Sequence, residues 1–323
     1  MRAIVHERFG PPEVLELQEV EQPPLTDEGV LVRVHAASVN PFDWHFLTGI
    51  PYLARLGAGL RAPKTKRLGS DFAGTVEAVG NARTDFRPGD EVFGTRNGAF
   101  GEYVLARKSI VHKPANVSFE AAAAVPIAGV TALQALRRGG IQAGQKVLVN
   151  GASGGVGTFA VQIAKSFGAE VTGVCSTRNV EQTASIGADR VIDYTQEDFT
   201  RDGARYDLVI DIAGDRPWSQ VKRVLPDDGT SVVVGGPKSN RFFGRLGMSL
   251  VERAIAIPDS RTLVTPFLAN IGPDDLAFLG GLLEAGSVKP VIERRYDLSE
   301  VPEALRYMGE GHARGKLVVT VRP

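Results

Sequence analysis

The spacing of apolar residues divides the chain into stretches of different character. Over the first hundred residues, short apolar runs at 30–34, 73–79 and 91–93 alternate with turns rich in Gly and Pro, which is typical of short strands. These runs predict an irregular β-rich domain, a partly open barrel. Ser118 is a good helix cap, and helices are expected at 120–125 and 130–136.

From residue 146 onward, apolar strands alternate with helices. The expected strands are 146–150, 170–174, 191–192, 208–212 and 231–234, and the expected helices are 156–167, 180–186 and 218–225. This rhythm implies a parallel sheet that helices cover on both faces. After residue 257 we expect helices at 276–285 and 302–309 and a closing strand at 317–321.

The predicted fold is therefore α/β with two domains. A doubly wound parallel sheet, residues 118–263, is inserted into a β-rich domain made of residues 1–117 and 264–323. We expect the C-terminal tail to return to this first domain.

Composition narrows the class of protein. The 323 residues include 37 basic and 37 acidic side chains, so no net charge attracts nucleic acid, and no nucleic-acid partner is expected. Cys175 is the single cysteine, which excludes an intrachain disulfide and sites built from several cysteines. The opening residues lack an apolar signal core and no apolar run is long enough to span a bilayer. We therefore expect a cytoplasmic protein without stable membrane insertion.

The clearest chemical motif is a glycine-rich turn between the strand 146–150 and the helix that follows. Glycines let the backbone turn tightly and approach a pyrophosphate, and the N–H groups at the helix start bind its charge. The spacing differs slightly from G-x-G-x-x-G, so a tight turn without a ligand is the alternative. The residues expected to bind cofactor here are Gly151, Ser153, Gly154, Gly155, Val156 and Gly157.

The end of the strand 170–174 decides which dinucleotide is expected. NAD sites usually have an acidic residue there, which accepts from the ribose hydroxyls. This chain has Ser176, Thr177 and Arg178, whose hydroxyls and guanidinium suit a 2′-phosphate. NADPH is therefore favoured as the cofactor, unless the hydroxyls only cap the next helix. Further strand-end residues expected to let the cofactor lie close are Ala213, Gly235 and Gly236.

With these residues in view, the chain resembles the medium-chain dehydrogenase/reductase superfamily, in the quinone oxidoreductase branch that includes zeta-crystallin. The resemblance covers essentially the whole chain, through the glycine loop and the stretches 37–43, 69–74, 87–94, 126–136 and 311–317. It implies a GroES-like catalytic domain split around a Rossmann domain, and a homodimer is expected.

The resemblance also bears on metal binding. Zinc-dependent relatives carry a cysteine ligand where this chain has residues 38–40, and Gly-His-Glu where it has Gly69, Ser70 and Asp71. The five histidines show no paired ligand spacing, so no metal is predicted. Without a Lewis acid, alcohol oxidation is disfavoured. Hydride transfer to a quinone or an α,β-unsaturated carbonyl is expected instead, because conjugation spreads the negative charge.

The resemblance implies roles for particular side chains. Asn40 would donate its amide to the acceptor oxygen, and Tyr52 would donate a hydrogen bond or a proton. The alternatives are that Asn40 holds a turn and that Tyr52 is a pocket wall. The resemblance suggests that Asp43 and Asp71 order the domain junction, and neither is expected to act as a general base. Residues expected near the nicotinamide are Thr131, Pro266, Phe267, Arg314, Gly315 and Lys316.

Other functions stay open at this point. Five basic residues within 53–68 would suit the carrier arm of an enoyl-thioester, although a solvated lid is the plainer interpretation. An NADP-dependent alcohol dehydrogenase and a cofactor-binding protein without turnover are further alternatives. The apolar segment 241–257 is expected to cap the pocket, to pack at a subunit interface or to touch a membrane surface.

Overall fold

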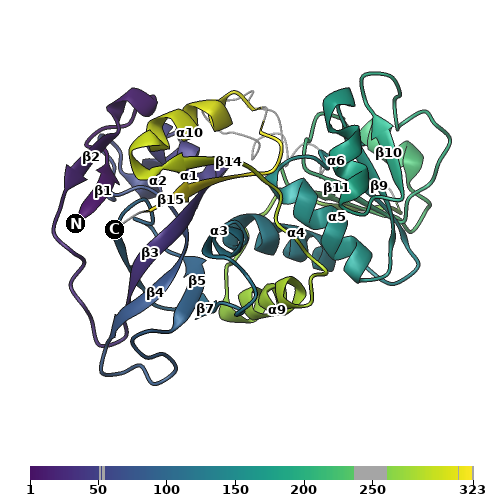
Figure 1. Ribbon diagram of the computed structural model, residues 1–323. Coiled ribbons are helices and arrows are strands. Elements are labelled where there is room, and N and C mark those ends of the chain that lie inside the picture. The colour runs from purple at the N-terminus through teal and green to yellow at the C-terminus, as the bar shows by residue number, and fades with distance from the viewer. Residues whose placement is uncertain (51, 53–54, 236–259, 312, 322–323) are drawn as a thin grey trace. The chain divides into compact units, whose positions relative to one another are not determined.

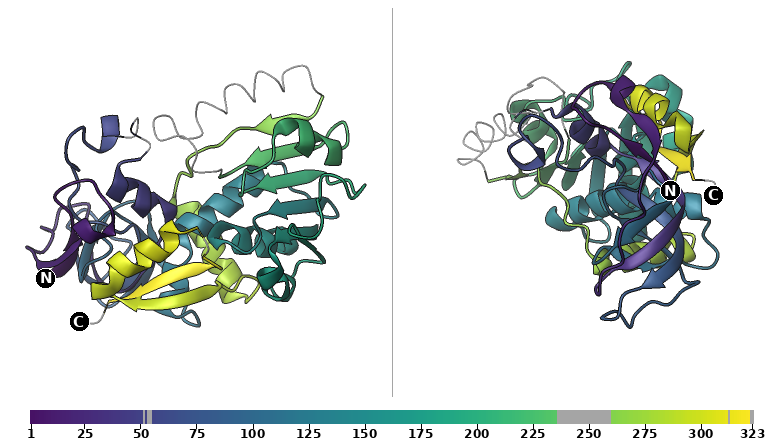
Figure 2. Two further views of the ribbon diagram at one scale, coloured as in Figure 1. Left: turned by 90° about the horizontal axis from the view of Figure 1, so that it is seen from above. Right: turned by 90° about the vertical axis from the view of Figure 1, so that its left-hand side faces the viewer.

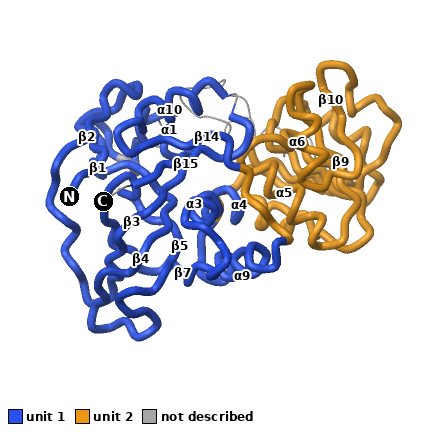
Figure 3. The backbone as a smooth tube through the Cα atoms, in the orientation of Figure 1, with its two compact units in different colours: residues 1–130, 270–286, 292–323 blue, residues 131–269, 287–291 orange. Residues whose placement is uncertain are grey.

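The computed structural model describes residues 1–50, 52, 55–235, 260–311 and 313–321. They form two compact units (Figure 3). Unit 1 comprises residues 1–130, 270–286 and 292–323, and unit 2 comprises residues 131–269 and 287–291. The expected apolar segment 241–257 lies outside the described residues.

Unit 1 is built on a curved sheet in which the C-terminal tail pairs with the N-terminal half. The strand order is β14-β15-β3-β4-β5-β7, and β6 also pairs with β3. The closing strand β15 runs antiparallel to β3, so the expected return of the tail is confirmed (Figure 1). The strands are β3 (Val30–Val39), β4 (Asp71–Val79), β5 (Glu91–Thr95), β6 (Tyr103–Ala106), β7 (Ile110–His112), β14 (Ile292–Asp297) and β15 (Lys316–Thr320), with a separate pair β1 (Arg2–Val5) and β2 (Glu16–Glu19).

Apolar side chains of this sheet form one core with the helix α10. Buried Val32, Phe72 and Val319 from the sheet pack in the same cluster as Leu305 of α10. The helices of unit 1 are α1 (Pro41–Thr48), α2 (Arg55–Ala58), α3 (Phe119–Ala123), α9 (Pro273–Glu284) and α10 (Val301–Gly309), together with the first part of α4 (Pro126–Arg138).

Helix α3 corrects one expected boundary. The sequence pattern assigned residues from 118 onward to the Rossmann domain, but α3 packs on β3 and β4 and belongs to unit 1. Its cap is as expected, since the Ser118 hydroxyl accepts from the N–H of Ala121 at 3.2 Å. A short alanine-rich helix needs a large apolar surface to pack on, and the sheet of unit 1 supplies it.

Unit 2 contains the predicted parallel sheet. Its order is β10-β9-β8-β11-β12-β13, and all five pairings are parallel. This is the order of a Rossmann fold, in which the chain reverses direction across the sheet after its third strand. The strands are β8 (Lys146–Asn150), β9 (Glu170–Cys175), β10 (Arg190–Asp193), β11 (Leu208–Asp211), β12 (Thr230–Val233) and β13 (Thr262–Val264).

The helices of unit 2 pack beside these strands, as two further views show (Figure 2). They are the last part of α4, α5 (Gly155–Ser166), α6 (Val180–Ser185) and α7 (Trp218–Val221). Single-turn 3₁₀ segments follow β9 at Thr177–Asn179 and α7 at Lys222–Val224, and in unit 1 they lie at Pro12–Val14 and Leu298–Glu300. Within the described residues, we find no helix with the length and apolar content that crossing a bilayer requires.

Candidate active site

The glycine loop follows β8, the first strand of the Rossmann order, as the sequence predicted. Gly151 has a φ of +90°, a conformation that favours glycine. A Cβ on Gly157 would lie 2.1 Å from the Gly151 carbonyl oxygen, so α5 can pack this closely only with glycine there. The helix cap is Gly154, which has no side chain to occupy the first N–H groups of α5. These features fit a pyrophosphate at the helix start.

Beside the loop, polar side chains gather at the end of β9. The side-chain amide of Asn179 donates to the Ser153 hydroxyl at 3.0 Å and to the Ser176 hydroxyl at 3.2 Å. Arg178 is exposed next to them. Thr177 differs from the two serines, because it donates its hydroxyl proton to Asp193 at 2.6 Å. Of the three residues predicted to meet the 2′-phosphate, Thr177 thus already uses its donor.

Hydrogen bonds from the Asn150 side chain link the end of β8 to the end of β11. Asn150 donates its amide protons to Asp211 and Asp215, both at 2.9 Å. Ala213, predicted to lie near the cofactor, is exposed just beyond β11. A Cβ on Gly235 would lie 2.2 Å from the Ile212 carbonyl, so close backbone approach explains that glycine. Gly236 lies outside the described residues.

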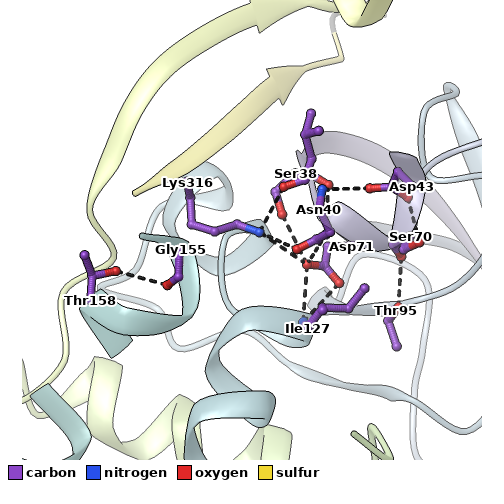
Figure 4. A network of polar contacts seen from close by, with 11 residues as sticks. Ser38, Asn40, Asp43, Ser70, Asp71, Thr95, Ile127, Gly155, Thr158 and Lys316 are labelled. Carbon is purple, nitrogen blue, oxygen red and sulfur yellow. Dashed lines mark hydrogen bonds and ion pairs between the residues drawn. The ribbon is translucent and has the colours of Figure 1, made fainter. Parts of the chain in front are cut away.

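Unit 1 contains a buried cluster of charged groups that includes Lys316, Asp71 and Asp43 (Figure 4). The Lys316 ammonium donates to Asn40 Oδ1 at 2.6 Å and to the Val39 carbonyl at 3.2 Å, and it lies 3.9 Å from Asp71 Oδ2. Lys316 is 3% exposed and Asp71 is fully buried. Antiparallel pairing of β15 with β3 brings these groups together, although 276 residues separate Lys316 from Asn40.

Asp71 links this cluster to helix α4. Its carboxylate accepts the Asn40 amide at 2.9 Å and the Ser38 hydroxyl at 3.2 Å. The N–H of Ile127, in the first turn of α4, points at both carboxylate oxygens, at 3.2 and 3.3 Å. A carboxylate is favourable at a helix N-terminus, so Asp71 caps α4 from the start of β4.

Asp43 completes the cluster on the side of α1. One of its oxygens accepts the backbone N–H of Asn40 at 2.8 Å, and the other accepts the Ser70 hydroxyl at 2.8 Å. Together with Asn40 it forms a capping box that starts α1. Asp43 and Asp71 thus accept hydrogen bonds at the starts of α1 and α4, and a role at the domain junction stays a prediction.

Two carboxylates and one ammonium are buried together, and this burial shifts the pKa of all three groups. Burial raises the pKa of Asp43 from 3.8 to about 7, against the opposing hydrogen bonds from Ser70 and Asn40. Burial also raises the pKa of Asp71 to about 6, although Lys316 and its hydrogen-bond donors lower it. The pKa of Lys316 is lowered by burial and raised in part by the two carboxylates. The cluster therefore favours binding one proton near neutral pH.

These contacts change the expectation for Asn40. Its amide was predicted to donate to the acceptor oxygen, but both N–H groups are used, one by Asp71 and one by the Ser38 carbonyl at 3.3 Å. The side chain is only 1% exposed. In this structure Asn40 thus orders neighbouring groups, and Lys316, predicted to line the nicotinamide, is its buried partner.

The other predicted residues occupy different surroundings. Tyr52 is 37% exposed, and the guanidinium of Arg55 lies 4.8 Å from its ring centre. Phe267 lies under Arg138, with 4.3 Å between the guanidinium carbon and the ring centre, and Pro266 is half-buried beside it. Thr131 is half-buried in α4, and Gly315 is buried with a φ of +122°. Their contact with a cofactor or substrate stays a prediction.

Asn179 is the polar residue that sequence reasoning missed as part of the site. A lone asparagine after a strand gives no periodic signal, and only the fold brings it to the glycine loop.

No three His, Cys, Asp or Glu side chains gather as a metal ion would require in the part of the chain that the structure describes.

Two family models match the sequence. A GroES-like domain of alcohol dehydrogenases matches residues 26–117, and a zinc-binding dehydrogenase model matches residues 186–319. Among curated proteins, a chloroplastic quinone oxidoreductase, QR1 of Triphysaria versicolor, is 33% identical over 99% of this chain and 98% of its own. The mitochondrial NAD(P)H oxidoreductase RTN4IP1 of Mus musculus is also 33% identical, over 99% of this chain and 89% of its own.

Solved structures show the same relationship. A quinone oxidoreductase from Coxiella burnetii superposes with a TM-score of 0.87 at 33% identity, over 100% of this chain and 99% of that chain. The Escherichia coli quinone oxidoreductase complexed with NADPH gives a TM-score of 0.83 at 25% identity, over 99% of this chain and 100% of that chain.

Proposed function

This chain belongs to the quinone oxidoreductase branch of the medium-chain dehydrogenase/reductase superfamily, and from that premise we propose that it is a zinc-independent, NADPH-dependent reductase of quinones or α,β-unsaturated carbonyls. Membership of the branch supports an oxidoreductase that uses a nicotinamide cofactor. The choice of NADPH, the independence from zinc and the class of acceptor are our proposals.

The preference for NADPH is supported by the donors in the glycine loop and at the end of β9. Ser153, Ser176 and Arg178 offer hydroxyl and guanidinium protons, and β9 ends without a carboxylate of its own. The N–H groups at the start of α5 would hold the pyrophosphate. The related Escherichia coli enzyme was solved with NADPH bound, which agrees with this choice.

One observation carries the proposal of zinc independence. The Lys316 ammonium lies among residues 38–40 and Asp71, the two segments where zinc-dependent relatives have ligands, and it is 2.6 Å from Asn40 Oδ1. An ammonium at this place repels a divalent cation, and its hydrogen bond to Asn40 Oδ1 occupies an oxygen atom that a metal would need.

When bound, NADPH supplies the hydride. We assign to Asn40 a positioning role, because its amide and carbonyl are held by Asp71, Ser38 and Lys316. Tyr52 remains our candidate for donating a proton to the reduced acceptor, since its side chain is partly exposed and carries a hydroxyl. A conjugated acceptor suits a site without a metal, because its negative charge is delocalised.

An acceptor panel tests this function. Chelator-treated protein is mixed with NADPH and either a quinone, an enone, a saturated aldehyde or an enoyl thioester, and loss of nicotinamide absorbance is followed. We expect turnover with quinones or enones and little with the saturated aldehyde. Equal turnover of the aldehyde, or turnover of the thioester alone, would contradict the proposed acceptor class.

A further inference from the structure

Asn179 ties the glycine loop to the end of β9. Its side chain is 5% exposed, and its backbone N–H donates to the Ser176 carbonyl at 2.8 Å. The side-chain amide nitrogen reaches Ser153 at 3.0 Å and Ser176 at 3.2 Å. A single buried amide therefore holds two hydroxyls that lie far apart in the sequence.

The direction of these two hydrogen bonds fixes what the serines can offer a ligand. An amide nitrogen carries two protons, and here one goes to each hydroxyl oxygen, so each serine accepts and keeps its own proton. The amide oxygen of Asn179 is buried, and none of the described residues donates to it. Ser153 and Ser176 are both partly exposed, so their protons can be donated to a bound group.

Two outward hydroxyl protons suit one kind of ligand. Phosphate oxygens only accept hydrogen bonds, whereas the ribose hydroxyl of NAD is usually held by a carboxylate that accepts from it. The next residue, Thr177, shows the opposite arrangement, because its hydroxyl proton goes to the Asp193 carboxylate. At the end of β9, the side-chain partner of each hydroxyl thus decides whether its proton is available to a ligand.

We infer that Asn179 is a positioning residue that sets the preference for NADPH over NADH, by orienting the Ser153 and Ser176 hydroxyls as donors to the 2′-phosphate. The inference rests on the NADPH-dependent function proposed above and adds the residue that fixes the polarity of the phosphate site. Asp at this position would accept from both hydroxyls, turn their protons inward and add a negative charge.

Ligand binding to the cofactor-free protein tests this inference. Calorimetry with adenosine 2′,5′-bisphosphate and with adenosine 5′-monophosphate compares a ligand that has the 2′-phosphate with one that lacks it. We expect Asn179→Asp to weaken the bisphosphate by about 10-fold or more and the monophosphate by less than about 3-fold. Ala184→Asp adds the same charge on the exposed face of α6 and is expected to leave both affinities nearly unchanged.

A second variant, Asn179→Ala, separates the orientation of the hydroxyls from the added charge. Asn179→Ala adds no charge and frees the two hydroxyls to rotate, so the bisphosphate should again weaken more than the monophosphate, by a smaller factor. The same loss for both ligands in the two Asn179 variants, or an equal loss in Ala184→Asp, would overturn the role of Asn179. If the wild-type protein itself binds both ligands equally, the proposed NADPH preference fails instead.

Discussion

Removing the Lys316 ammonium should leave a buried carboxylate without its counter-charge. Lys316→Met keeps the apolar stem and deletes the group that faces Asp71 and Asn40. Breaking a buried pair from one side typically costs about 3–5 kcal/mol, because the remaining charge is uncompensated. The size of the loss in this protein depends on pH, and the dependence can be worked out from Asp71.

The pKa of Asp71 is raised to about 6 with the ammonium beside it, and without the ammonium it rises further. Above pH 6 the wild-type Asp71 ionises, while the variant must keep it protonated. This costs about 1.4 kcal/mol for each pH unit, or about 3 kcal/mol at pH 8. At pH 5 Asp71 is protonated in both proteins, and only the loss of the hydrogen bonds to Asn40 and to the Val39 carbonyl remains, about 1–2 kcal/mol. We therefore expect a loss that grows with pH.

Urea unfolding at pH 5 and pH 8 measures this difference. The chain has two tryptophans, Trp44 in unit 1 and Trp218 in unit 2, so a Trp218→Phe background makes fluorescence report on unit 1. Trp44 is a suitable probe because α10 packs against it, as a Cβ on Gly309 would lie 2.5 Å from its ring. Lys108→Met removes an exposed ammonium from unit 1 and serves as the control.

Adding Asp71→Asn to Lys316→Met should remove most of the part of the loss that depends on pH, because the carboxyl that faces the missing ammonium is then gone and only Asp43 remains in the cluster. The reasoning is refuted if the loss is the same at pH 5 and pH 8. It is also refuted if the double variant keeps the pH dependence of Lys316→Met.

Further predictions concern the buried carboxyl of Asp43, the glycine loop, the binding of NADPH and the donation of a proton to the acceptor. The pKa of Asp43 is raised from 3.8 to about 7, so the unfolding free energy of the wild-type protein should fall as the pH rises through this window. Asp43→Asn should remove up to about 4 kcal/mol of that fall. If urea unfolding shows the same dependence of stability on pH in both proteins, this prediction is wrong. Gly157→Ala forces a Cβ to within 2.1 Å of the Gly151 carbonyl oxygen and should lower the unfolding free energy by about 1–3 kcal/mol. It should also weaken NADPH binding, measured by fluorescence titration, and an unchanged affinity would contradict the assignment of the loop to the cofactor. Arg178→Ala should raise the KM for NADPH by about 10-fold and leave NADH nearly unchanged, whereas equal effects would exclude contact with the 2′-phosphate. Tyr52→Phe should lower kcat without changing cofactor affinity, and an unchanged kcat would make Tyr52 a pocket wall.

Features that are contiguous in sequence were predictable. The strand β8 has the predicted bounds, because a strand buried on both faces gives an unbroken apolar run, and the glycine loop follows it directly. The strand β14 was not predicted, since its sequence Ile-Glu-Arg-Arg-Tyr-Asp is charged and it lies at the edge of its sheet. Edge strands tolerate charge, so the period-2 pattern is weak there.

The buried cluster was predictable only in part. The resemblance pointed to Asn40 and Lys316 separately, and nothing local in the sequence indicates that the two side chains meet. Their contact follows from the pairing of β15 with β3, which is a long-range property of the fold. The use of Asn40 in ordering its neighbours follows from that pairing too.

Steady-state turnover with NADPH and with NADH, before and after exhaustive chelation, tests the central claim most directly. A quinone serves as acceptor, and metal content is measured on the same samples. We predict a kcat/KM at least about 10-fold higher for NADPH, as expected for charge-assisted hydrogen bonds to a phosphate, and no change after chelation. Equal use of both cofactors, or loss of activity that zinc restores, would contradict the account.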